Sequence, residues 1–85
     1  MSKHVKTLQR LAAVPTPTNI KWDDLVGALE HLGYKLLSND GSRRKFVFPE
    51  TNEVISLHKP HPQPEVKQYA IRAVVDHLKL NGRIN

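Results

Sequence analysis

The feature that most constrains the fold is an alternation of side-chain types in residues 43–48, followed by a turn. With the two-residue period of a β-strand, two aromatic side chains fall on one face and two cations fall on the other. The two faces are Arg44, Phe46 and Phe48 and, opposite them, Arg43, Lys45 and Val47. Residues 49–52 supply the turn, and residues 53–57 are predicted to form the next strand. We expect a hairpin with its aromatic face buried and its Arg43 and Lys45 face solvated.

A further strand is predicted directly before this hairpin. Residues 34–38 have strand character, and Asn39, Asp40 and Gly41 favour a turn because these residue types tolerate positive φ. Strands that follow one another closely in sequence usually pair with each other. The sequence therefore predicts a three-stranded antiparallel sheet.

Helices are predicted on both sides of the sheet segment, over residues 3–14, over residues 20–31 and from Pro64 to a stop at residues 81–82. Proline-rich residues 15–19 and 59–64 are predicted to be connectors. Gly27 lies inside the second helix, where glycine costs about 1 kcal/mol relative to alanine, so it marks a close approach of another element. The prediction is one α+β domain over residues 1–85.

The apolar positions of the two longer helices each form one stripe. They are Trp22, Leu25, Val26, Leu29 and Leu32 in the second helix, and Val66, Ala70, Ile71, Val74 and Leu78 in the last. Both helices are therefore expected to pack on one core.

Composition narrows the class of protein. Of the 85 residues, 39% are hydrophobic and 25% charged, which is typical of a chain that folds, and no apolar run approaches the roughly 20 residues of a membrane helix. The first six residues lack the features of a secretory signal, so the cytoplasm is expected. The absence of cysteine excludes disulfides and thiolate metal sites. The formal net charge of +5 favours a polyanion or an acidic protein as partner.

Arg43, Arg44 and Lys45 are three consecutive cations in one predicted strand. On an open sheet face, arginine binds phosphate bidentately and stabilises the extra charge of a pentacoordinate phosphorane. The alternative interpretation is a solvated edge strand, whose charges prevent aggregation.

His58 and His61 flank Lys59 and Pro60 and form the clustered pair of histidines. Metal-independent RNA cleavage needs a base for the 2′-hydroxyl proton and an acid for the leaving 5′-oxygen, and imidazole serves as either. Lys59 would bind phosphate beside them. Two plainer interpretations stay open: the histidines lie in a basic loop without a role, or they contribute to a metal site, for which two ligands are too few. No metal or other cofactor is expected.

Several segments follow one another in a particular order: Trp22-Asp23-Asp24-Leu25 to Leu32-Gly33-Tyr34, then Gly41-Ser42-x-x-x-Phe46, the connector rich in proline and histidine, and the final helix. In this order they resemble the HicA toxins of HicA–HicB toxin–antitoxin systems. The resemblance covers about residues 20–80, so residues 20–82 correspond to the family core and residues 1–19 to an added helix and linker. It implies a double-stranded-RNA-binding-like fold, an endoribonuclease that cuts mRNA, an antitoxin of the HicB type that covers it, and a cytoplasmic setting.

One position departs from the family pattern. The family carries a catalytic histidine directly after the Gly-Ser pair, where this sequence has Arg43. Arginine stays protonated and is no general base. Either His58 or His61 supplies the imidazole, with His61 first because it lies near a family histidine after the third strand, or Arg43 acts by electrostatics alone, or the chain binds RNA without cutting it. A protein-interaction module with a basic face for an acidic partner is a further alternative.

Overall fold

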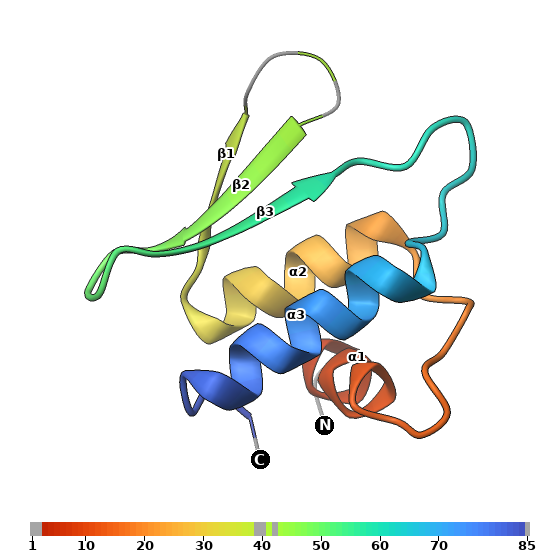
Figure 1. The fold of residues 1–85 in the computed structure, drawn as a ribbon, viewed down its shortest axis with the longest axis horizontal. Helices are drawn as coiled ribbons and strands as arrows, with labels where there is room; N and C mark the ends of the chain where they lie inside the picture. Colours follow the sequence, from red (N-terminus) through yellow and green to blue (C-terminus); the bar gives the residue numbers. More distant parts are fainter. Residues whose placement is uncertain (1–2, 39–40, 42, 85) are drawn as a thin grey trace.

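The computed structural model describes residues 3–38, 41 and 43–84, and these form three layers (Figure 1). A sheet forms the first layer, α2 and α3 lie under one of its faces, and α1 packs on α2 on the side away from the sheet. The elements in chain order are α1 (Lys3–Leu11), α2 (Trp22–Leu32), β1 (Lys35–Ser38), β2 (Arg43–Phe48), β3 (Glu53–His58) and α3 (Gln68–Leu80). This order confirms the predicted α+β fold with an added N-terminal helix.

The sheet is antiparallel with strand order β1-β2-β3, as predicted. The central strand β2 pairs along its length with β3, so that Phe46 faces Ile55 and Arg44 faces Leu57. Asn39, Asp40 and Ser42, which belong to the predicted turn and to the Gly-Ser pair, lie outside the described residues. Gly41 has a φ of 61°, the left-handed conformation that its place in a turn requires.

The core lies between the sheet and the two helices beneath it. Phe46, Leu25, Leu29, Ile71 and Leu78 are fully inaccessible to solvent. They come from β2, α2 and α3, so the apolar stripes of both helices meet the aromatic side of the hairpin. The predicted burial of this side of β2 is confirmed for Phe46, while Phe48 is partly buried against the core.

The last helix begins later than predicted. α3 starts at Gln68, and Pro64 belongs to an extended segment that pairs with the chain before α2. The Trp22 amide donates to the Pro64 carbonyl (2.8 Å), and the Val66 amide donates to the Ile20 carbonyl (2.7 Å). These long-range hydrogen bonds take the backbone groups that a first helical turn would leave unsatisfied. Val66 is buried as expected, but from extended chain and not from a helix.

Gly27 marks the close approach that the sequence predicts, and its neighbour is α1. A Cβ atom at this position would lie 2.5 Å from Cε1 of His4. The His4 ring also lies 5.7 Å, centroid to centroid, from the ring of His31 on α2. The glycine therefore lets α1 seat its histidine directly on the backbone of α2.

We predict that the effect of Gly27→Ala on stability depends on His4. Alanine favours the helix by about 1 kcal/mol, but its Cβ meets the imidazole. In a His4→Ala background the substitution should stabilise the protein, and in the native background it should be less favourable by about 1 kcal/mol or more. Urea denaturation of the four proteins of this cycle measures the coupling. Equal effects in both backgrounds would contradict it.

Candidate nucleic-acid interface

The face of the sheet that points away from α2 and α3, called the outer face below, has none of the described helices over it (Figure 1). Alternation along the strands and the register across them define its members. They are Lys35, Leu37, Arg43, Lys45, Val47, Val54, Ser56 and His58. All of these except the half-buried Val47 are exposed. The outer face is therefore a basic surface with apolar side chains toward one end.

Arg43 lies directly opposite His58 in the pairing of β2 with β3. Opposed residues on an antiparallel sheet have Cβ atoms about 4.5–5.5 Å apart, so the guanidinium and the imidazole serve the same small region. Lys45 follows on the same face and lies opposite Ser56. These four side chains belong to the lining of a hollow of about 390 Å³. The sequence named three of them, but it did not give the register that joins them.

Arg44 points to the other side of the sheet. Its Nη1 atom donates to the carbonyl oxygens of Gly41 (2.8 Å) and Arg43 (2.7 Å). With Gly41 and Pro60 it lines a second hollow, of about 340 Å³, that includes Lys59 and His61. The two-residue period of a strand therefore turns Arg44 away from Arg43 and Lys45, although Arg44 also contributes to the lining of the hollow that these two share.

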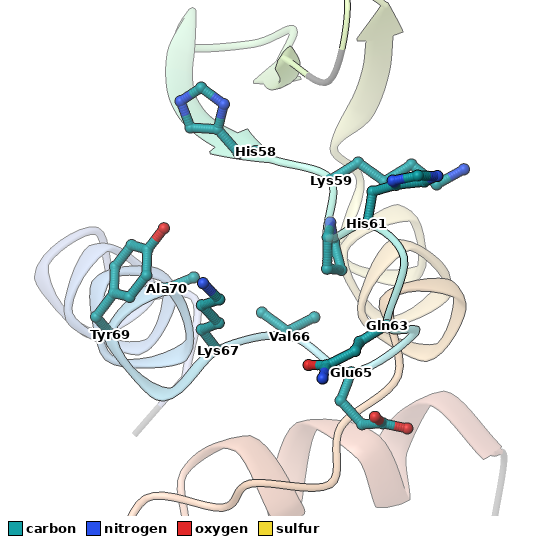
Figure 2. A pocket seen from close by; sticks show the side chains of 10 residues that line it. His58, Lys59, His61, Gln63, Glu65, Val66, Lys67, Tyr69 and Ala70 are labelled. Carbon is teal, nitrogen blue, oxygen red and sulfur yellow. The ribbon is translucent and has the colours of Figure 1, made fainter.

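His58 and His61 do not point toward one another (Figure 2). The His58 ring stands on the side of β3 away from Tyr69, and the His61 ring lies beside Lys59 on the connector. Of the two imidazoles, His58 shares the outer face with Arg43. Among residues 3–38, 41 and 43–84, no three His, Asp or Glu side chains are grouped as metal ligands.

A third hollow, of about 190 Å³, lies between the end of β3, the connector and the beginning of α3 (Figure 2). Tyr69 and Lys67 line it together with His58 and Lys59. Sequence reasoning missed Tyr69. Its signal was an aromatic residue outside the apolar stripe of the last helix, a position that predicts exposure, and its side chain is 65% exposed.

The opposite end of the sheet is held by a cluster around Glu53. The carboxylate accepts hydrogen bonds from the Tyr34 hydroxyl (3.0 Å), the Thr51 hydroxyl (2.8 Å) and the Arg83 guanidinium. Arg83 also lies over the ring of Phe48, 3.7 Å from its centroid, and His77 Nε2 lies 3.5 Å from the carboxylate. The segment after α3 is thus bound to the β2–β3 turn.

These contacts shift two pKa values. The hydrogen bond from Arg83, more than those from Thr51 and Tyr34, lowers the pKa of Glu53 from 4.5 to about 2. Burial, together with the neighbouring carboxylate, raises the pKa of Tyr34 to about 12. Both shifts come from a polar cluster distant from Arg43 and His58, so they concern stability.

We predict an acid-dependent loss of stability that Glu53→Gln removes. A carboxyl group whose pKa is lowered on folding stabilises the folded state above its ordinary value of 4.5, and this contribution is lost as pH falls toward about 2. Glu53→Gln should therefore be less stable than the native protein at neutral pH, and the difference should shrink at acid pH. Urea midpoints across this range measure it, with exposed Glu50→Gln as the control. A difference independent of pH would contradict the prediction.

Comparison with known proteins adds independent information. A family model described as the HicA toxin of bacterial toxin–antitoxin systems matches residues 22–81. The matched region starts with α2, contains all three strands and α3, and leaves α1 outside. No curated protein and no solved structure matches the chain.

Proposed function

Because the chain belongs to the HicA toxin family, and is therefore a toxin of the bacterial toxin–antitoxin kind, we propose that it is an endoribonuclease that cleaves mRNA and blocks translation. The observation that carries this proposal is the placement of Arg43 opposite His58, with Lys45 on the same open face. A fixed cation beside an imidazole is the combination that cleavage of a phosphodiester by proton transfer uses.

The proposed reaction consumes no co-reactant, because the proton that the 2′-hydroxyl loses is balanced by the proton that the 5′-oxygen gains. The ribose 2′-oxygen attacks phosphorus, its proton passes to a base, the bond from phosphorus to the 5′-oxygen breaks, and that oxygen takes a proton from an acid. The products are a 2′,3′-cyclic phosphate and a 5′-hydroxyl. Arg43 binds the non-bridging oxygens, whose charge increases in the transition state, and His58 transfers one of the protons.

We assign this proton transfer to His58 and not to His61. It shares the outer face with Arg43 and Lys45, whereas the His61 ring lies beside Lys59 on the connector (Figure 2). The cations of Lys59 and Arg44 line the same hollow as His61, which supports a role of these two cations in attracting the RNA backbone.

We predict that His58→Ala lowers the rate of RNA cleavage by about 100-fold or more, the usual contribution of a general acid or base. His61→Ala should change the rate much less. His31→Ala, which removes an exposed imidazole on α2, serves as the control. Cleavage of a labelled RNA and growth arrest on expression are the measurements, and His58→Ala should still bind RNA. Full activity of the His58→Ala protein would remove the assignment.

A second function, RNA binding without cleavage, is favoured by one observation. The position after Gly41 and Ser42 holds arginine, and among the described residues His58 is the imidazole of the outer face. Cleavage needs a base and an acid, and the described part of this face offers one imidazole for the two proton transfers. This alternative predicts stable RNA complexes and no cleavage products.

Both functions predict salt-sensitive RNA binding through the outer face. Removing one phosphate-binding cation should reduce the slope of log K against log salt by roughly 1. Lys45→Ala should show this reduction, and Lys79→Ala, an exposed lysine near the end of α3, should not. Binding titrations of a labelled RNA at several salt concentrations measure both slopes. Identical slopes for the two variants would exclude the outer face as the phosphate-binding surface.

A toxin of this family implies an antitoxin that neutralises it. We propose that this partner is a protein of the HicB type, encoded next to the toxin, and that both act in the cytoplasm. None of the described helices is long and apolar enough to cross a membrane.

A further inference from the structure

We propose that the hollow between the end of β3 and the beginning of α3 binds one nucleotide of single-stranded RNA, with its base against the ring of Tyr69 and its phosphate held by Lys67. This inference rests on the proposed function, because it names where the RNA continues once it leaves the outer face. It adds a base-binding residue, Tyr69, to a site otherwise composed of cations and imidazoles.

Tyr69 is available for this role because the core does not use it. The neighbouring residues Ala70 and Ile71 are buried, while the Tyr69 side chain is 65% exposed. Its hydroxyl end is directed toward the side where β3 ends (Figure 2). The hydroxyl makes no hydrogen bond with another described residue. Aromatic side chains bind bases by stacking without regard to sequence, because every base has a π face.

The charge around the ring suits a phosphate. Lys67 lies beside Tyr69 and is exposed, whereas the Lys59 side chain extends alongside His61 and away from Tyr69 (Figure 2). Neither lysine forms an ion pair with another described residue. The carboxylate nearest in sequence, that of Glu65, points away from the two lysines (Figure 2). Buried Val66 and Ala70 provide an apolar floor. The hollow, which Glu65 also lines, thus combines a ring, an apolar surface and the cation of Lys67.

His58 connects this hollow to the outer face. It lines both the 190 Å³ hollow with Tyr69 and the 390 Å³ hollow with Arg43 and Lys45. The His58 ring itself stands on the outer face, away from Tyr69 (Figure 2), so an RNA strand whose phosphate lies between Arg43 and His58 reaches Tyr69 by passing around the end of β3. An acidic peptide would need the lysine but not the ring, so the ring separates the two ligands.

The test uses a fluorescein-labelled, mixed-sequence 2′-O-methyl oligoribonucleotide, which binds but lacks the attacking hydroxyl. Fluorescence anisotropy gives Kd for the native protein and for Tyr69→Ala, Tyr69→Phe and Lys67→Ala. Leu80→Ala and Lys79→Ala are matched controls at the other end of α3, where Leu80 is 86% exposed. The thermal midpoint of each variant checks that it is folded.

Tyr69→Ala should weaken binding about 10-fold, within the range for loss of one stacked base, and Tyr69→Phe should bind as the native protein does. Lys67→Ala should weaken binding and reduce the salt slope by roughly 1, unlike Lys79→Ala. If Tyr69→Ala binds as tightly as Leu80→Ala, the inference is overturned. Loss of binding by Lys67→Ala without loss by Tyr69→Ala overturns it as well, because that pattern is the one expected of an acidic peptide site.

Cleavage of unmodified RNA, measured in parallel, separates this inference from the proposed function. A native protein that binds the probe and cleaves nothing, with binding lost in Tyr69→Ala, supports the nucleotide site and removes the nuclease. A native protein that cleaves, with Kd and KM unchanged in Tyr69→Ala, keeps the nuclease and removes the nucleotide site. Absence of any binding by the native protein removes both.

Discussion

Burial of the inner face of the hairpin fixes everything that the outer face presents. Phe46, Ile55 and Leu57 pack on α2 and α3, and their burial sets the register of β2 with β3. A slip of one residue would turn Arg43 and Lys45 into the core and expose the aromatic rings. The free energy of burying these apolar side chains, about 1.5–3 kcal/mol for each, therefore also holds the cations and His58 in place.

This fixed register places Arg43 opposite His58. Where the resemblance to the family implies a histidine, this chain places a permanent cation, directly across the ladder from an imidazole on β3. The pair lies where β3 ends and the connector begins. At the other end of the same strand, Glu53 binds Arg83 and the segment after α3. A rigid ladder thus separates the polar cluster that serves stability from the proposed site.

The sequence predicts what depends on local periodicity and fails where distant segments meet. The strands and the burial of Phe46 follow from alternation, and the neighbour of Gly27 was expected though not named. The start of α3 does not follow, because the hydrogen bonds from Val66 to Ile20 and from Trp22 to Pro64 override the preference of Pro64 for a first helical turn. The same holds for the pairing of Arg43 with His58, which needs the register, and for Tyr69, whose hollow forms only when the connector folds back.

The described ion pairs leave the cations of the outer face without a carboxylate partner. The described carboxylates that form ion pairs do so elsewhere: Asp24 with Lys3, 3.2 Å apart, and Glu53 with Arg83 and His77. Arg43 and Lys45 form no ion pair with a described carboxylate, so no described carboxylate compensates their charges on this surface. Because α1 packs on the helices and not on the sheet, the added N-terminal segment leaves that surface open. A polyanion approaching the molecule is therefore attracted to the face where Arg43 and His58 stand.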